Sequence, residues 1–178
     1  AQAQRVGQVA LHWIHAMHVN ASPDDPQFAR LRRKVNWAAQ LHEVGVAISH
    51  SDYHKHGAYI LDNADMVGFS VPELHLLGLL VLGQRGKLKK LDVELEDNDF
   101  AKMLLALRLS VILCHARKDP AHEALSLHCD EHKQRVTLTA PASWVNDYPQ
   151  STHLLKLENG AWQKAPWSFE FVTNPDRK

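Results

Sequence analysis

Through most of the chain, apolar residues recur at intervals of three and four, the spacing that places them on one face of a helix. The first such segment covers residues 1–19, and its apolar face is formed by Val6, Val9, Ala10, Trp13 and Met17. A second helix is expected from Asp25, an N-cap residue followed by Pro26 at the first helical position, to a stop at Gly45. The N-terminal part of the chain therefore predicts a helical bundle.

Further helices are expected before residue 122. A short one covers 53–64, and a longer one opens at Ser70 and Glu73, which have the spacing of a capping box, and runs to about Gln84. The next covers 99–118 and is apolar on nearly all sides. A helix with that pattern belongs in the centre of a bundle, where other elements cover all of its faces.

The periodicity changes after Asp119 and Pro120. Apolar and polar residues alternate over 125–129 and again over 136–139, which indicates a β-hairpin with a polar turn. A helix over 150–163 and a strand over 168–173 complete the chain. The predicted fold class is α+β: a mostly helical domain of residues 1–122, then a small domain of residues 123–178 with a three-stranded sheet and one helix.

The composition is that of an ordinary globular protein, because 45% of the 178 residues are hydrophobic and 22% are charged. The formal net charge is zero, so no overall field attracts nucleic acid or a membrane, and neither is expected as a partner. The longest apolar run, 76–82, is too short to cross a bilayer. Two cysteines without CxxC spacing indicate a reducing compartment, so a cytoplasmic location is expected.

The segment 41–61 carries the most distinctive chemistry. It opens with His42 and Glu43, where metal-dependent phosphohydrolases of the HD type have a His-Asp pair. In those enzymes the pair holds divalent ions together with a histidine on an early helix and a later aspartate. Here the early position falls on Gln2, and the late helix offers no carboxylate before Asp119. No working metal site is therefore expected.

Three histidines follow in the same segment, His50, His54 and His56. His54 and His56 are two positions apart and point away from each other on a helix, which favours capping or backbone hydrogen bonds over metal binding. One alternative stays open: a free-standing HD-type metal-dependent phosphohydrolase with an altered metal site formed by His42, Glu43 and His50. No nucleophile motif or phosphate-binding P-loop is present in the sequence, so no catalytic residue is assigned.

Two clusters of basic residues could bind a polyanion. They are formed by Arg30, Arg32, Arg33 and Lys34 in the second expected helix, and by Arg85, Lys87, Lys89 and Lys90 after the fourth. Guanidinium and ammonium groups are what a phosphate chain needs. Each cluster can equally be a solvated face, and the acidic segment 92–99 could neutralise the second one.

Several segments together resemble the C-terminal half of the Ppx/GppA family of exopolyphosphatases and guanosine pentaphosphate phosphohydrolases. They are residues 41–45, 48–61, 63–65, 68–70, 83–88 and 107–114. The similarity covers most of residues 1–120, and Gln84 stands where the family is expected to have histidine. Glu43 in place of aspartate agrees with the altered motif of the family itself.

This resemblance implies a bacterial, cytoplasmic parent enzyme whose N-terminal pair of actin-like domains carries the phosphatase site, with acidic residues and Mg²⁺. It implies that this chain is a third, HD-like helical domain without a working metal centre, followed by a small α+β domain. In the family this region contributes to a basic passage for polyphosphate and to dimer contacts. The first residue is Ala1 rather than methionine, which fits a piece of a longer protein.

The leading hypothesis is therefore an accessory module that is not catalytic alone and has no cofactor of its own. It is expected to act as a homodimer, with the N-terminal actin-like domains of its parent chain. Its ligand is expected to be polyphosphate or guanosine pentaphosphate, and the residues reveal no preference between them. The phosphate contacts that we predict are Arg32, Arg33, His54, Lys55, His56, Arg85 and Lys87. A third hypothesis is purely structural: the module dimerises the parent, with Trp13, Trp162 or Trp167 as the apolar anchor.

Overall fold

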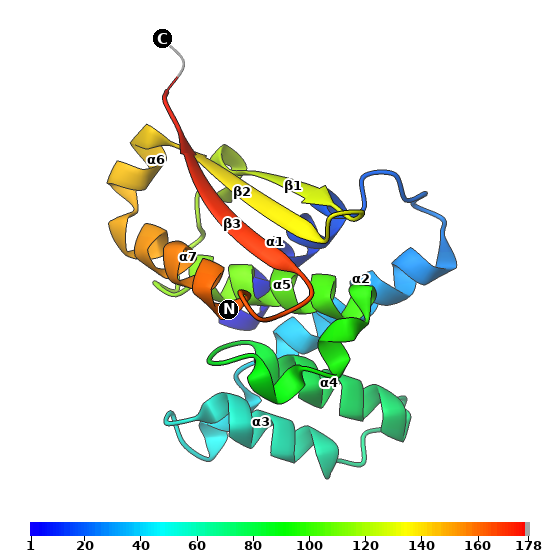
Figure 1. Cartoon of the computed structure of the whole chain (residues 1–178). Helices are drawn as coiled ribbons and strands as arrows, with labels where there is room; N and C mark the ends of the chain where they lie inside the picture. Colours follow the sequence, from blue (N-terminus) through cyan, green and yellow to red (C-terminus); the bar gives the residue numbers. More distant parts are fainter. Residues whose placement is uncertain (177–178) are drawn as a thin grey trace.

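The computed structural model describes residues 1–176, and its N-terminal part is a bundle of helices. The helices are α1 (Gln2–Ala16), α2 (Pro26–Leu41), α3 (Tyr53–Asp62), α4 (Val71–Gly83) and α5 (Asn98–Leu113). Figure 1 shows α3 and α4 packed against each other at one end of the molecule, with α5 near its centre. Short 3₁₀ helices lie in the connections, at Val44–Ala47, Lys89–Leu91, Glu94–Glu96 and His122–Ala124.

Side-chain caps fix where α2, α4 and α5 begin, and the cap of α5 is Asp97. Asp25 precedes α2, and its Oδ1 accepts a hydrogen bond from the backbone N–H of Gln27 at 3.0 Å. Ser70 and Glu73 form a capping box at α4: Glu73 N lies 3.3 Å from Ser70 Oγ, and Ser70 N lies 2.9 Å from Glu73 Oε2. These contacts confirm both starts predicted from the sequence.

The helix ends differ from the prediction. The helix α2 ends at Leu41 rather than Gly45, because the chain tightens there into the 3₁₀ helix Val44–Ala47. The helix α3 ends at Asp62, slightly before the expected end. The helix α5 ends at Leu113 rather than Lys118, since Arg117 has a left-handed backbone with a φ of 58°, which an α-helix cannot include.

The C-terminal part is a three-stranded sheet with two helices. The strands β1 (Ser126–Asp130) and β2 (Arg135–Pro141) pair antiparallel, as the hairpin prediction requires. The strand β3 (Ser168–Asn174) pairs parallel with the other edge of β2. A parallel pairing needs a crossover connection, which is supplied by α6 (Ala142–Asp147) and α7 (Pro149–Ala161). The sequence predicted α7 but not α6.

The hydrophobic core is continuous from the bundle to the sheet. Every residue of α5 from Phe100 to Ser110 is buried, and α5 contacts α1, α2 and α4 as well as α7. The buried cluster includes Val136 and Phe169 of the sheet together with Trp13 of α1. The α+β class is thus confirmed, whereas the boundary at residue 122 stays a prediction. No helix within residues 1–176 has both the length and the apolar character needed to cross a membrane.

The tryptophans expected to anchor a dimer lie inside the chain. Trp13, Trp162 and Trp167 expose 0%, 1% and 1% of their surface. Trp167 is also held by a hydrogen bond from its Nε1 to Asn98 Oδ1, at 3.0 Å. The prediction that these rings form an interface is therefore wrong, because the continuous core uses them to fill the space between bundle and sheet.

Gly45 permits a close approach of two segments, and its replacement tests that packing. A Cβ at residue 45 would lie 2.0 Å from Tyr53 O and 2.5 Å from Gly57 N, which are backbone atoms of α3. We expect Gly45→Ala to lower the free energy of unfolding, measured in urea, by about 1–3 kcal/mol, as overpacking does.

Gly160→Ala in α7 is the matched control. A Cβ at that position meets no atom within 4 Å. Because alanine has the higher helix propensity, we expect the free energy of unfolding to stay unchanged or to rise by up to about 1 kcal/mol. Equal destabilisation by both changes would contradict a special close contact at Gly45.

Candidate functional site

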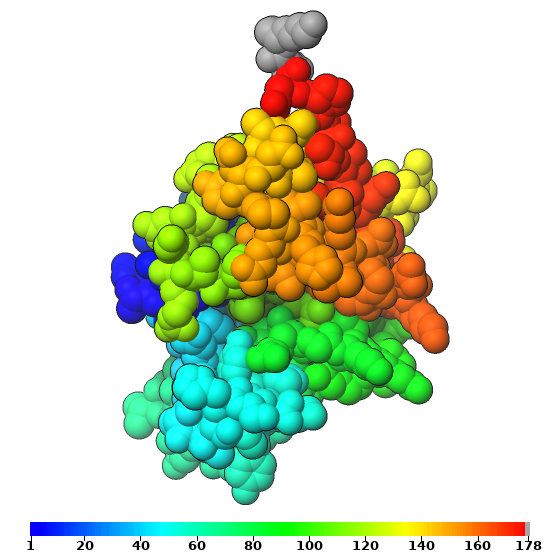
Figure 2. Space-filling model, turned by 90° about the vertical axis from the view of Figure 1, so that its left-hand side faces the viewer, coloured from blue at the N-terminus to red at the C-terminus, as the bar shows by residue number. Residues whose placement is uncertain are grey.

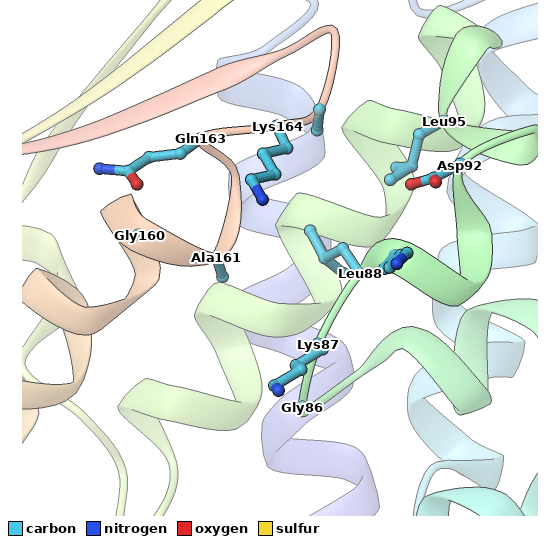
Figure 3. A pocket seen from close by; sticks show the side chains of 11 residues that line it. Gly86, Lys87, Leu88, Asp92, Leu95, Gly160, Ala161, Gln163 and Lys164 are labelled. Carbon is cyan, nitrogen blue, oxygen red and sulfur yellow. The ribbon is translucent and has the colours of Figure 1, made fainter.

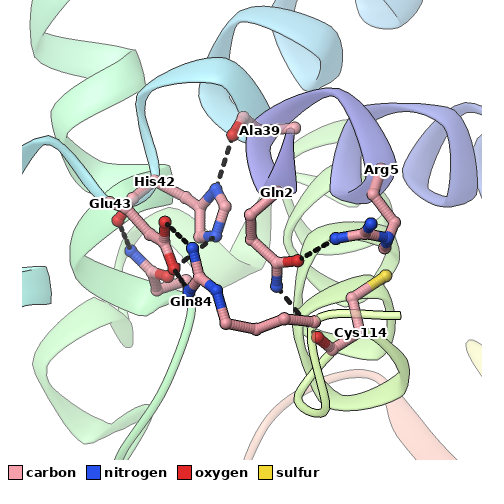
Figure 4. A network of polar contacts seen from close by, with 8 residues as sticks. Gln2, Arg5, Ala39, His42, Glu43, Gln84 and Cys114 are labelled. Carbon is pink, nitrogen blue, oxygen red and sulfur yellow. Dashed lines mark hydrogen bonds and ion pairs between the residues drawn. The ribbon is translucent and has the colours of Figure 1, made fainter. Parts of the chain in front are cut away.

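His42 and Glu43, the pair that we compared with an HD motif, lie where α2 ends, and their polar side chains are engaged with the protein itself (Figure 4). The imidazole of His42 is buried, and its Nδ1 lies 2.5 Å from Ala39 O. Burial is the main cause that lowers the pKa of His42, so the ring is neutral at pH 7. The Glu43 carboxylate accepts bonds from the Arg117 guanidinium at 2.8 and 3.4 Å. A guanidinium thus stands beside the carboxylate where an HD enzyme holds a metal ion.

The position expected for the early histidine is filled by Gln2, which ties α1 to the end of α5. Its Nε2 donates to Cys114 O at 2.9 Å, and its Oε1 accepts from Arg5 Nη1 at 2.7 Å. Arg5 also pairs with Asp119, with 2.9 Å between Nε and Oδ1. Gln2 is therefore a structural link between helices.

The residues of the alternative metal site do not fit a metal centre. Glu43 binds the Arg117 guanidinium, and His50 is exposed. His42 bonds the backbone through Nδ1, and its Nε2 lies 3.9 Å from Oε1 of its own neighbour Glu43. Throughout residues 1–176, no group of three histidine, cysteine, aspartate or glutamate side chains is placed so that it could hold a metal ion. We therefore derive no metal-dependent step for this chain.

Gln84 connects the altered motif to the segment that follows α4. Its Nε2 donates to the carbonyl oxygen of His42 at 2.6 Å, and the residue is buried. Within the described part of the chain, no group bonds its Oε1. The carbonyl group of His42 thus restrains Gln84, the residue directly before Arg85, with which the second basic cluster begins.

That basic cluster faces the first turn of α3 across an open hollow of about 770 Å³. We call it the basic hollow, and it is lined by Asp52, His54, Lys55, Arg85, Gly86, Lys87, Lys89 and Lys90. Figure 2 shows this side of the molecule, with the cyan segment that leads into α3 next to the green segment that follows α4. Five cationic side chains surround one space, and Asp52 is the one carboxylate among these lining residues.

The cations of the basic hollow repel one another, and two pKa values reflect this. Burial, then the charges of Lys90 and Arg85, lower the pKa of His54 to about 4. Burial, then the charges of Lys55 and Arg108, lower the pKa of Lys90. His54 is therefore neutral at pH 7, and the five cations, of which Lys55 lies 3.8 Å from the Asp52 carboxylate, leave the hollow with a net positive field.

The backbone comes close to His54 and Lys90 at Gly86. Its φ of +80° is left-handed, a conformation that favours glycine. A Cβ at this position would lie 3.8 Å from His54 Nε2 and 3.9 Å from Lys90 Nζ. At the rim, the guanidinium carbon of Arg85 lies 5.1 Å from the ring centroid of Tyr53, which restrains this long side chain.

A second hollow, of about 500 Å³, continues from the first (Figure 3). The two hollows share Gly86, Lys87 and Lys89. The opposite wall comes from residues 160–165 at and after the end of α7, and it adds Lys164, whose ammonium group points into the space. The second hollow thus adds one cation, Lys164, and one carboxylate, Asp92, to the two lysines that it shares with the basic hollow.

Four of the predicted phosphate contacts are brought together in the basic hollow: His54, Lys55, Arg85 and Lys87. The structure adds Lys89 and Lys90, which the sequence already showed as part of the same cluster. It also adds Lys164, an isolated lysine in the sequence that only the fold brings near. That these side chains bind phosphate stays a prediction.

The other predicted contacts lie elsewhere. Arg32, Arg33 and His56 are not among the residues that line either hollow. On α2, the guanidinium carbon of Arg32 is 5.1 Å from the ring centroid of Phe28, and that of Arg33 is 5.6 Å from the ring centroid of Trp37. The two arginines thus lie outside both hollows, each stacked on an aromatic ring of α2, and their role as phosphate contacts also stays a prediction.

Comparison with known proteins shows what this chain is similar to. A family model described as "Ppx/GppA phosphatase, domain III" matches residues 1–159. The chain is also 32% identical over 137 residues to the guanosine-5'-triphosphate,3'-diphosphate pyrophosphatase of Aeromonas salmonicida (strain A449), covering 75% of this chain and 27% of that protein. It is 33% identical over 132 residues to the protein of the same name from Pseudoalteromonas translucida (strain TAC 125), covering 72% and 26%.

The chain therefore belongs to the Ppx/GppA phosphatase family, as the resemblance of its motifs indicated. It spans about a quarter of the length of the curated relatives that it matches. The matched region corresponds to domain III of the family, consistent with a C-terminal part of a longer protein.

His54 makes the stability of the fold depend on pH. Its pKa is about 4 in the folded protein, against an ordinary 6.5, so the unfolded chain binds more protons between these values. The corresponding stability is present above pH 6.5 and is lost as the pH falls toward 4. We expect urea unfolding at about pH 7.5 and pH 4.5 to show a smaller loss of stability for His54→Gln than for the wild type.

The difference between the two proteins isolates this residue. His12, His18 and His42 also have lowered pKa values, with burial as the first cause, but they are present in both proteins. The same pH dependence in wild type and variant would contradict a buried, neutral His54.

Proposed function

We propose that this chain is a C-terminal, non-catalytic module of a Ppx/GppA phosphatase, and that its basic hollow binds phosphate groups of the substrate. The observation that carries this proposal is the convergence of five cationic side chains, from α3 and from the segment after α4, on one open hollow. Their mutual repulsion contributes to the lowered pKa values of Lys90 and His54. A bound polyanion relieves that repulsion, so the folded chain is already arranged to attract it.

A phosphate chain is the class of ligand that suits this geometry. Hydrogen bonds between phosphate oxygens and charged donors contribute about 1.5–3 kcal/mol each where they are well formed. Lysines line both adjoining hollows, and although Asp92 also lines the second one, this supports an extended anion over a single phosphate. The relatives are named guanosine-5'-triphosphate,3'-diphosphate pyrophosphatases, which supports a nucleotide polyphosphate as ligand beside inorganic polyphosphate.

Hydrolysis belongs, in this proposal, to the rest of a longer chain. The relatives are about four times as long as the part matched here, which leaves room for the N-terminal actin-like domains and their Mg²⁺. This chain would then bind the part of the substrate that projects away from the reacting phosphate. In this role the chain holds and orients the substrate, and it transfers no proton to the reacting atoms.

A homodimer contact is also part of the proposal. Because the tryptophans are buried, such a contact has to use other apolar surface. Tyr59, Val67 and Val71 expose 68%, 103% and 79% of their surface, and they lie close in sequence where α3 leads into α4. Sedimentation that finds only monomer at high protein concentration would remove this part of the proposal.

Removal of one cation from the basic hollow is expected to weaken the binding of inorganic tripolyphosphate. Arg85→Gln and Lys87→Gln should each raise the dissociation constant, measured by calorimetry at low salt, by about tenfold, since one charge-assisted bond is lost. Binding by the wild type should weaken steeply as salt is added, because exposed charges are screened.

Lys133→Gln provides the matched control. Lys133 is an exposed lysine in the turn between β1 and β2, so its removal changes the net charge by the same amount at a distant place. We expect no change in affinity. An equal weakening by all three variants would mean that net charge alone attracts the anion, and no weakening at Arg85 or Lys87 would refute the hollow as the site.

A further inference from the structure

A buried ion pair contacts the turn that lines the basic hollow. Arg108 of α5 and Glu158 of α7 expose only 5% and 3% of their surface. The guanidinium donates from Nε and from Nη2 to the two carboxylate oxygens of Glu158, both at 2.7 Å. The pair thus joins α5, the central helix of the bundle, to α7 of the C-terminal part.

The same guanidinium also binds the turn that follows α4. Nη1 of Arg108 donates to Gly83 O at 2.8 Å and to Gly86 O at 3.1 Å. These two carbonyl groups lie on either side of Gln84 and Arg85, and Lys87 follows directly in the chain. One buried side chain therefore closes the turn on which two of the proposed phosphate contacts stand.

Two further features restrict this turn. Gln84 Nε2 donates to His42 O at 2.6 Å, and Gly86 has a left-handed φ of +80°. Without Arg108, the carbonyl groups of Gly83 and Gly86 would lose the donor that they share. Gly83 is buried, so its carbonyl group would be left without a donor at a cost, whereas water can serve the exposed Gly86. The turn would have to rearrange, and the side chains that it carries would move with it.

We propose that Arg108 and Glu158 are positioning residues of the anion site, which hold the turn 83–86 so that Arg85 and Lys87 are in place before a phosphate chain binds. The inference rests on the proposed function of the basic hollow. It goes beyond that function because Glu158 of α7, outside the helical bundle, helps to position the phosphate contacts. Side chains that are ordered in advance lose less freedom on binding, which raises affinity.

Stability of the fold alone does not require a charged pair at this place. Apolar residues of similar size fill such buried positions as well as an ion pair does, or better. What they cannot supply is the donor for the two carbonyl groups of the turn. The charge of Arg108 also reaches the hollow, since it follows burial and Lys55 among the causes that lower the pKa of Lys90.

The first test replaces the pair without leaving a buried charge behind. Arg108→Met combined with Glu158→Gln removes both charges, and glutamine keeps an acceptor for Trp162 Nε1, which lies 3.2 Å from Glu158 Oε2. Binding of inorganic tripolyphosphate to the whole chain is measured by calorimetry, and folding by thermal unfolding. We expect a folded protein whose dissociation constant is about tenfold higher, the effect of having to order one or two long side chains on binding.

Arg108→Lys separates geometry from charge. Lysine keeps the positive charge opposite Glu158, but its ammonium group cannot serve two carboxylate oxygens and two carbonyl groups at once. We expect affinity to fall by about fivefold, less than in the double variant. Wild-type affinity in Arg108→Lys would overturn the positioning role, and this variant decides the matter if the double variant does not fold.

Lys102→Met combined with Glu131→Gln is the matched control. Lys102 is buried on α5 and pairs with Glu131 at 2.6 Å, and neither residue lines the two hollows. Its loss should leave affinity unchanged, whatever happens to Tm. Equal weakening in this control, or wild-type affinity in the folded Arg108–Glu158 double variant, would overturn the inference. Wild-type protein that binds no tripolyphosphate would overturn the proposed function first, and the inference with it.

Discussion

The buried ion pair between Arg108 and Glu158 is the contact on which the arrangement of the candidate site depends. Two charges removed from water are stable only when their donors and acceptors find partners of good geometry. Arg108 meets this condition with two carboxylate oxygens and with the carbonyl groups of Gly83 and Gly86. One side chain thereby joins the central helix, the C-terminal layer and the turn that carries the cations. The position of the turn that lines the basic hollow therefore depends on a buried side chain as well as on surface residues.

His42 and Glu43, the pair compared with an HD motif, have a structural role at the end of α2. The carboxylate of Glu43 is neutralised by Arg117, and the ring of His42 is neutral and bound to the backbone. The carbonyl group of His42 accepts a hydrogen bond from Gln84 and thereby holds the end of α4. This contact connects His42 to the turn that begins the basic cluster, and so to the anion site that we propose.

Local rules were sufficient for those parts of the fold that depend on neighbours in sequence. The caps at Asp25 and Ser70 and the hairpin of β1 and β2 were predicted because each is a short-range pattern. The basic hollow was predicted in part for the same reason, since most of its cations are adjacent in the chain. The role of Arg108 was not predicted, because it lies in an apolar helix and its partner Glu158 is 50 residues further along the chain. The short helix α6 has no apolar periodicity that could reveal it, and the end of α2 depends on contacts of His42 that only the tertiary structure supplies.

We propose that phosphate chains bind at the basic hollow. Locating the residues that respond to a bound anion tests this proposal most directly. The measurement is a titration of the ¹⁵N-labelled chain with inorganic tripolyphosphate, followed residue by residue in two-dimensional NMR spectra. We expect the largest saturable shifts at His54, Lys55 and residues 85–90, with smaller ones toward Lys164. Shifts centred on α2 around Arg32 and Arg33, or no saturable shifts at all, would contradict the claim.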